Sequence, residues 1–184
     1  MTMLRITVGP FVYTAQMEEA DAPETCAAFG KLLPWRSKLI HCRWTGESCW
    51  IPLGDFNLGV GFENHTSHPA PGEVLWYPGG FSETELLFPY GATMFSSKLG
   101  QLAGNHFLTI AEGREQLREL GRMVLWQGAQ DMEPVPESRG SKNSMRPSST
   151  RAAVIRLSSG EGGSPLGRMN SALSAVIEVA AAAP

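Results

Sequence analysis

Residues 62–91 read FENHTSHPAPGEVLWYPGGFSETELLFPYG and contain the features that decide the predicted fold. Two stretches of β-strand character, Glu73 to Tyr77 and Glu83 to Phe88, lie on either side of Pro78-Gly79-Gly80. Short strand-like runs separated by Gly and Pro are typical of a β-hairpin. The polar segment from Glu63 to His68 precedes this hairpin and is predicted to be a loop.

Further strands are predicted on both sides of this hairpin. They are Met3 to Val8, Phe11 to Met17, Lys38 to Trp44, Ser48 to Pro52, Ala92 to Ser97 and His106 to Ala111. About eight short strands with Gly and Pro turns between them favour a barrel or a sandwich. The predicted fold class is therefore mainly β.

Two amphipathic helices complete the predicted domain. Asp21 and Glu24 have the three-residue spacing of a capping box, and a short helix is predicted after them. A second helix, from Arg114 to Gln127, carries an apolar stripe that is expected to plug one end of the barrel. The stripe consists of Leu117, Leu120 and Val124, and ion pairs are predicted between Glu115 and Arg118 and between Glu119 and Arg122.

The amino-acid composition changes near residue 131. No Trp, Tyr or Phe follows Trp126, and residues 132–170 are rich in Ser, Gly, Pro and Arg. Such a segment buries too little apolar surface to offset the entropy that ordering removes. We predict one β-barrel domain over residues 1–131, a disordered tail over residues 132–170 and a short Ala-rich helix over residues 171–184, which is marginal in water unless it docks.

The charge balance disfavours polyanionic partners. The formal net charge is -3 and the pI is near 5.8, so neither a nucleic-acid nor an anionic-membrane partner is expected. The run from Ala175 to Ala183 contains Glu178 and is too short to cross a bilayer. The first residues lack the pattern of a secretory signal, so we expect a soluble, cytoplasmic protein.

Three cysteines, Cys26, Cys42 and Cys49, occur without any paired CxxC spacing. That spacing would have indicated a zinc site or a redox pair. Free cysteine often behaves as a small buried apolar residue. We therefore expect three reduced cysteines in the core.

Longer stretches of the sequence resemble a known fold. Residues 18–29, EEADAPETCAAF, are similar to the opening helix of cyclophilins, which also follows a β-hairpin. Three further stretches resemble an uncharacterised bacterial family with a cyclophilin-like fold, namely SKLIHCRWTGESCWIPLGD (37–55), ENHTSHPAPGEVLWYPGGFSETELLFPYGA (63–92) and KLGQLAGNHF (98–107). The resemblance implies a closed cyclophilin-like β-barrel of about eight strands with a helix capping each end.

The more distant similarity to cyclophilin-type peptidyl-prolyl cis-trans isomerases implies a proline site with an Arg in a Phe-His-Arg run. The nearest run here is Ile40-His41-Cys42-Arg43. If His41 is matched, Arg43 falls one residue later, and a shift of one residue turns a strand side chain to the other face. The resemblance to this family makes a peptide-binding module or prolyl isomerase the alternative function.

Polar residues that could bind a ligand gather in the motif-rich segments. An Arg can hold a carboxylate through two hydrogen bonds, and a Glu beside a His can support proton transfer. A metal would need a third ligand such as His41, and the spacing matches no ligand motif, so no metal and no cofactor are predicted. The predicted ligand-binding residues are Arg43, Glu63, Asn64, His65, Tyr90, Asn105 and His106, of which Arg43, Glu63 and His65 are the candidates for catalysis.

Three other residues receive structural predictions. Glu83 and Glu85 alternate along one strand, so they share a face, which we expect to be the solvated outer face. Trp44 shares a predicted face with Ile40 and Cys42 and is expected in the core.

The preferred function is the binding, or conversion, of a small ligand that bears a carboxylate or an amide. It rests on polar residues clustered among Trp and Tyr, as in pockets that are apolar with a few fixed polar groups. The partner is then a small molecule or, in the alternative, a short peptide. A further alternative is a structural homo-oligomer that associates through exposed Trp35 and Trp126.

Overall fold

The computed structural model describes residues 1–137 and is mainly β. Each predicted hairpin forms close to its predicted position. The strands are β1 (Met3–Val8), β2 (Phe11–Met17), β3 (Ser37–His41), β4 (Gly46–Gly54), β5 (His65–Thr66), β6 (Glu73–Tyr77), β7 (Thr84–Thr93), β8 (Ser96–Ser97), β9 (Gly100–Gln101), β10 (Gly104–Glu112) and β11 (Gln130–Pro136). The helices are α1 (Pro23–Gly30), a 3-10 turn η1 (Arg114–Gln116) and α2 (Leu117–Gln127).

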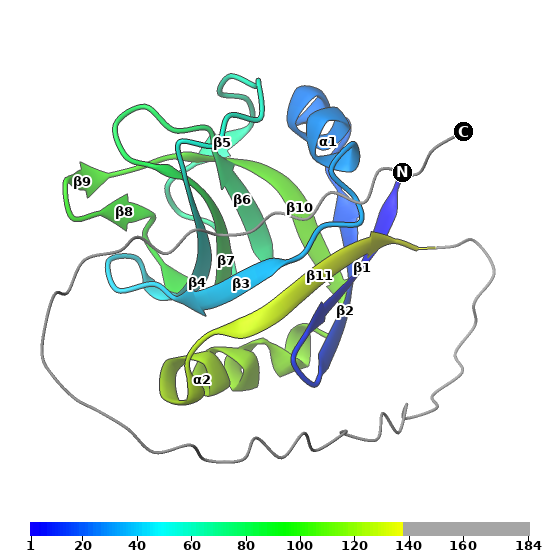
Figure 1. Ribbon diagram of the computed structural model, residues 1–184, viewed down its shortest axis with the longest axis vertical. Coiled ribbons are helices and arrows are strands. Elements are labelled where there is room, and N and C mark those ends of the chain that lie inside the picture. The colour runs from blue at the N-terminus through cyan, green and yellow to red at the C-terminus, as the bar shows by residue number, and fades with distance from the viewer. Residues whose placement is uncertain (138–184) are drawn as a thin grey trace, which may run out of the picture. The chain divides into compact units, whose positions relative to one another are not determined.

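Antiparallel pairing closes the main sheet into a barrel (Figure 1). Its strand order is β2-β1-β11-β3-β4-β7-β6-β10, and β10 pairs again with β2. The short β5 pairs only with β10 and lies outside this ring. The predicted closed barrel of about eight strands is confirmed.

The stretch at residues 62–91 supplies a central hairpin of the barrel. β6 pairs with β7 in the register Leu75 to Leu87 and Tyr77 to Glu85. β7 continues to Thr93, so the separate strand predicted from Ala92 to Ser97 is wrong. β7 is this long because its pairing with β4 continues as far as Gly46, which is matched with Thr93.

The two faces of β7 enter different apolar clusters. Leu86, Phe88 and Tyr90 point into the barrel and belong to the main core. Leu87 points outward and packs into a second cluster, here called the outer cluster, which consists of Leu75, Tyr77, Leu87, Phe95 and Leu102. Residues 94–103, which include β8 and β9, supply two of these side chains, so this segment covers part of the outer wall.

Aromatic rings fill the barrel at the α1 end. Phe29 of α1 makes edge contacts with Trp35, Trp76 and Phe107 at ring-centroid distances of 5.6, 6.2 and 4.9 Å. Trp35 is 8% exposed, so the prediction that it is an exposed contact residue is wrong. Its ring packs against Phe29, which removes it from water.

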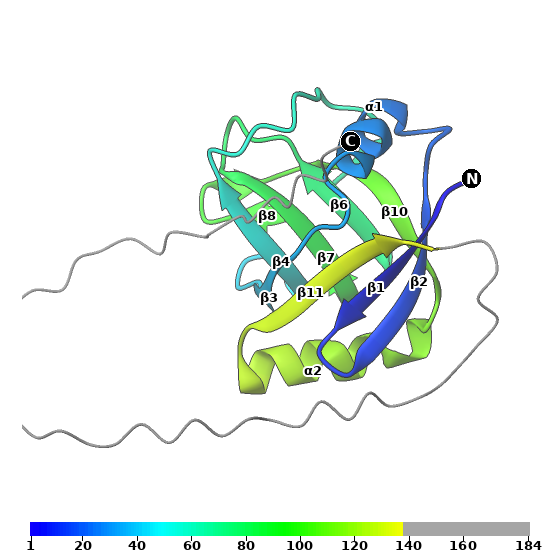
Figure 2. The same cartoon turned by 45° about the vertical axis from the view of Figure 1, so that its right-hand side comes forward.

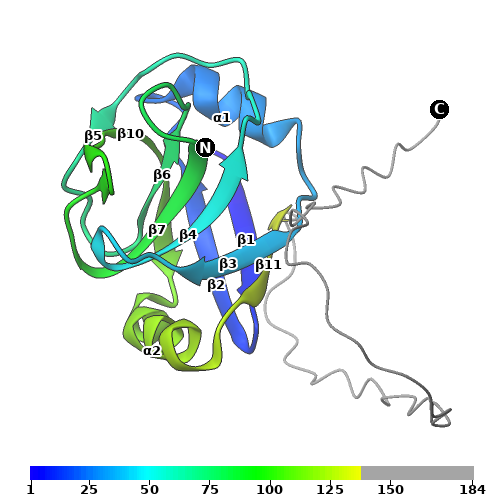
Figure 3. The ribbon, with the colours of Figure 1, turned by 60° about the vertical axis from the view of Figure 1, so that its left-hand side comes forward.

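The predicted apolar stripe of α2 is buried, and Figure 3 shows α1 and α2 at opposite ends. Leu117, Leu120 and Val124 are buried. The predicted pair of Glu115 with Arg118 does not form, because Arg118 reaches Glu47 of β4 at 3.5 Å. The second predicted pair on this helix is also absent from the ion pairs of the described residues.

Loop residues as well as α1 itself pack at the α1 end of the barrel. Phe56, Leu58 and Val60, from the loop after β4, pack against the same core. The predicted capping box is wrong: the N-cap residue is Ala22, and no side chain of the helix itself caps it.

The last described strand corrects the predicted domain boundary. β11 pairs with both β1 and β3 and lies between them in Figure 2. Residues 132–136 therefore belong to the barrel, and Met132 is buried in its core. The remainder of the predicted tail and the predicted Ala-rich helix lie outside the described residues.

The cysteines are buried and free, as predicted. Burial raises the pKa of Cys26 and of Cys49 to about 12, so both are protonated thiols at neutral pH. Within residues 1–137, no helix is long and apolar enough to cross a membrane.

Candidate functional site

The predicted polar loop is attached to α1. The Glu63 carboxylate accepts hydrogen bonds from the backbone N–H groups of Glu24, at 3.3 Å, and Thr25, at 2.5 Å. These N–H groups lie in the first helical turn, where they have no partner within the helix and where a negative charge is favourable. Glu63 is thus the N-terminal cap of α1, supplied from a distant loop.

Asn105 holds this loop from the strand side. It is fully buried on β10, and its Nδ2 donates to Thr25 Oγ1 at 3.0 Å and to the Gly61 carbonyl at 2.8 Å. Its Oδ1 accepts from the Glu63 backbone N–H at 3.1 Å. The side-chain amide therefore has partners on both its nitrogen and its oxygen.

Asn64 and His106 make local contacts. Asn64 has a left-handed φ of 41° and donates from Nδ2 to the His106 carbonyl at 2.8 Å. The His106 ring bonds through Nε2 to Thr109 Oγ1 at 2.9 Å, and Thr109 donates to Glu18 at 2.5 Å. A ligand-binding role for these residues stays a prediction.

Two predicted residues, His65 and Arg43, make no side-chain hydrogen bond or ion pair within residues 1–137. His65 is exposed, and its ring stands 5.8 Å from that of Phe62. Arg43 is exposed in the turn between β3 and β4. In residues 1–137 no hydrogen bond or ion pair joins Arg43 to Glu63, Asn64 or His65.

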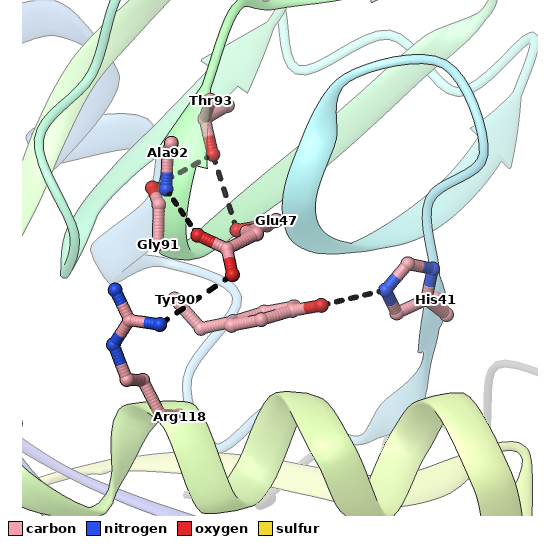
Figure 4. A network of polar contacts seen from close by, with 7 residues as sticks. All are labelled: His41, Glu47, Tyr90, Gly91, Ala92, Thr93 and Arg118. Atoms are coloured by element: carbon pink, nitrogen blue, oxygen red, sulfur yellow. Dashed lines mark hydrogen bonds and ion pairs between the residues drawn. The ribbon is translucent and has the colours of Figure 1, made fainter.

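Tyr90 belongs to a different network, next to α2 (Figure 4). Its hydroxyl is 2.8 Å from His41 Nε2, a pairing that the sequence did not predict. Burial lowers the pKa of His41, and burial together with Cys49 and Glu47 raises the pKa of Tyr90. Both side chains are therefore neutral at pH 7, and the pair is a polar link between β3 and β7.

The Tyr90 ring lies directly against the backbone of α2 at Gly121. A Cβ added to Gly121 of α2 would stand 2.4 Å from the Tyr90 ring, so only glycine lets the ring lie against the helix. Glu47 accepts a hydrogen bond from the Ala92 N–H at 2.8 Å and pairs with Arg118 (Figure 4). The network fixes the end of β4 against β7.

An open groove of about 470 Å³ lies beside this network. It is lined by Trp44, Thr45, Gly46, Ala92, Thr93 and Met94, and is called the groove below. Trp44 is 55% exposed and Met94 is 50% exposed. The core position predicted for Trp44 is wrong, because β3 ends at His41 and the alternation of strand faces does not extend into the turn.

Glu85 is buried on the outer wall. It shares the outward direction of Leu87, as the predicted alternation requires, but it is only 4% exposed, so the prediction of a solvated side chain is wrong. Burial and the neighbouring Glu83 raise the pKa of Glu85 to about 8. Among residues 1–137, no group of three or more His, Cys, Asp or Glu residues is placed to hold a metal ion.

One of two solved structures that are similar to this chain supports the fold. The structure of McbB in complex with tryptophan has a TM-score of 0.57 and 18% sequence identity, over 77% of this chain and 46% of that chain. The chain thus spans less than half the length of McbB. The solution structure of a hypothetical protein from Archaeoglobus fulgidus has a TM-score of 0.47 and 19% identity, over 74% of this chain and 95% of that chain.

Curated proteins gave no match. The similarity to cyclophilins stays a prediction. An uncharacterised family was expected from the motifs, and residues 4–135 match a family described as a protein of unknown function, DUF3830. The chain therefore belongs to the DUF3830 family.

Proposed function

We propose that the protein binds a small molecule with a flat apolar body and a carboxylate or amide group in the groove. The observation that carries this proposal is the pair of half-exposed side chains, Trp44 and Met94, that line a groove of about 470 Å³. Large apolar side chains that stay exposed around a concavity are typical of binding sites.

The floor of the groove suits a flat ligand. Gly46 approaches β7 so closely that an added Cβ would stand 2.7 Å from the Ala92 carbonyl oxygen. Thr93 Oγ1 is held by the carbonyl groups of Glu47 and Gly91, each at 3.1 Å. The floor is therefore backbone and small side chains, and an aromatic ring could lie between Trp44 and Met94 by stacking and sulfur contact.

Arg43 supplies the charge for a carboxylate. It directly precedes Trp44, is exposed, and has no carboxylate partner in the described part of the chain. A guanidinium binds a carboxylate through two parallel hydrogen bonds. McbB, similar in fold, is bound to tryptophan, which has both an aromatic ring and a carboxylate, and this makes aromatic carboxylates the first class to test.

The test is a thermal-shift and calorimetric screen of aromatic carboxylates, including tryptophan and indole-3-acetate, with their amides. We expect a hit to be lost in Trp44→Ala and weakened by about tenfold or more in Arg43→Gln. Trp126→Ala is the matched control, because Trp126 is 79% exposed on α2 and does not line the groove. Equal binding by the Trp44 and Trp126 variants would refute the proposal.

The openness of the groove to solvent also suits a short peptide. A prolyl-isomerisation assay tests this alternative, and loss of the activity in Trp44→Ala would locate the peptide in the groove. A homo-oligomer is the remaining alternative, and light scattering of the wild type and of Trp126→Ala tests it.

A further inference from the structure

Tyr77 is the centre of an aromatic group on the outer wall. Phe62 stands 6.0 Å from it between ring centroids, and Phe95 stands 5.8 Å from it. The Tyr77 hydroxyl accepts hydrogen bonds from the backbone N–H groups of Phe81, at 3.1 Å, and Ser82, at 3.3 Å. Tyr77 itself is 3% exposed, whereas Phe62 and Phe81 are 55% and 59% exposed. Two aromatic side chains thus face solvent around one buried phenol.

Glu85 is the direct cross-strand neighbour of Tyr77. The pairing of β6 with β7 places the two residues opposite each other, and on the other side Glu85 faces Pro52 of β4. Directly opposite residues on one face have Cβ atoms about 5 Å apart. The carboxylate and the phenol therefore belong to one surface.

The Glu85 carboxylate has no partner in residues 1–137. It takes part in none of their ion pairs, which use Glu19, Glu47, Asp131 and Glu133. It accepts no hydrogen bond there either. In the described residues, the side-chain polar atoms that are both enclosed and without a partner are Tyr13 Oη and Trp76 Nε1, so the Glu85 oxygens are not among them. The side chain is thus buried along its length, and its carboxylate oxygens are not fully enclosed.

The described residues that flank Glu85 carry no positive charge. Glu83, two residues earlier, is a second carboxylate and is exposed. Pro52 and Tyr77, which flank Glu85 on the neighbouring strands, carry no positive charge. A buried carboxylate without a cation is unfavourable, and a positively charged ligand would relieve this.

We propose that Tyr77, Glu85 and the exposed rings of Phe62 and Phe81 form a binding site for a small organic ammonium compound. Aromatic faces attract an ammonium group within about 6 Å of the ring centroid, and a carboxylate adds an ion pair. A metal ion fits less well, because the described residues offer no group of three ligands. The site uses no residue of the groove and does not rest on the proposed function.

Ionisation of Glu85 gives this site a distinctive pH dependence. Burial, followed by the charge of Glu83, raises the pKa of Glu85 to about 8. Glu83 is the charged group that acts on Glu85, Tyr77 faces it from β6, and Pro52 on β4 cannot titrate. About one tenth of Glu85 is then ionised at pH 7 and about nine tenths at pH 9, so the apparent affinity for a permanent cation should rise about ninefold.

The experiment titrates the protein with choline, whose charge does not depend on pH, at pH 7 and pH 9 and constant ionic strength. The uncharged isostere 3,3-dimethylbutan-1-ol is the ligand control, and ethanolamine tests whether a primary ammonium group suffices. Binding is followed by NMR shifts of the Tyr77 and Phe81 amides. We expect choline to bind about ninefold more tightly at pH 9 and the neutral isostere to bind at least tenfold more weakly than choline.

Two variants separate the roles of charge and rings. Glu85→Gln should remove the pH dependence of choline binding and most of the affinity. Phe81→Leu should weaken choline binding at least threefold at both pH values. Trp44→Ala, in the groove, is the control and should bind choline as the wild type does. Circular dichroism checks that each variant is folded. Equal binding of choline and its isostere, or an unchanged titration in Glu85→Gln, would overturn the proposal, and failure of the groove screen would leave it standing.

Discussion

Replacing Glu85 by Gln should stabilise the protein at alkaline pH. The structure buries Glu85 to 4% exposure with Pro52 and Tyr77 on either side, and no ion pair of residues 1–137 uses its carboxylate. Its pKa is raised from 4.5 to about 8 by burial and by Glu83. Since one pKa unit corresponds to 1.36 kcal/mol, the ionised carboxylate destabilises the folded state by about 5 kcal/mol, as an upper estimate.

The sign follows from proton binding. The folded state holds the Glu85 proton more tightly than the unfolded chain does, so stability decreases as pH rises from about 4.5 to about 8. Below this range both states are protonated and the carboxyl is neutral. Above it the full penalty applies. Glutamine, which is neutral at every pH, should therefore change stability little at pH 4.5 and increase it by several kcal/mol at pH 9.

Urea unfolding followed by tryptophan fluorescence measures this difference. Wild type, Glu85→Gln and Glu119→Gln are compared at pH 4.5, 7 and 9. Glu119→Gln is the control, because Glu119 is exposed on α2 and the substitution makes the same chemical change at the surface. Relative to wild type, the unfolding free energy should increase between pH 4.5 and pH 9 only for Glu85→Gln. Parallel stability curves for the two variants would show that the Glu85 carboxylate is solvated, and would refute both this reasoning and the ammonium site.

Two further substitutions test the contacts that position the candidate residues. Glu63→Ala removes the cap of α1 and should lower the unfolding free energy by about 1 to 2 kcal/mol in urea titrations. Glu24→Ala is its control and should lower it by less than about 0.5 kcal/mol, because the exposed Glu24 side chain makes no hydrogen bond or ion pair within residues 1–137. Gly121→Ala should destabilise by about 1 to 3 kcal/mol, because the new methyl would stand 2.4 Å from the Tyr90 ring, although alanine favours a helix. Gly30→Ala is its control, since nothing lies within 4 Å of that Cβ; equal effects of the two glycine variants would contradict the packing of Tyr90 on α2.

The strands could be predicted because their signal is local. Alternation along β2 and β7, with Gly and Pro between the runs, identified the hairpins and the direction of each side chain. The outward direction of Glu85 was predicted correctly in this way. Its burial was not, because Phe95 and Leu102, which form the outer cluster with Tyr77, come from a later segment whose position depends on tertiary packing.

The polar residues were harder to interpret. Glu, Asn and His in one loop have the composition of a binding site, yet Glu63 caps α1 from 39 residues away and Asn105 is satisfied by Thr25 and Gly61. A capping side chain is usually sought within the helix itself, which is why Asp21 was predicted instead. The partner of a polar side chain is set by three-dimensional contacts that residue type alone does not encode.

The groove and the ammonium site both depend on the segment that follows β7. Met94 lines the groove, and the next residue, Phe95, packs against Tyr77. The Met94 N–H donates to the Thr45 carbonyl at 3.1 Å, and the Phe95 N–H donates to the Ser67 carbonyl at 2.7 Å. The two residues are consecutive, so one backbone segment supports both sites. If a ligand in one site changes the affinity of the other, the coupling free energy must be the same in both directions.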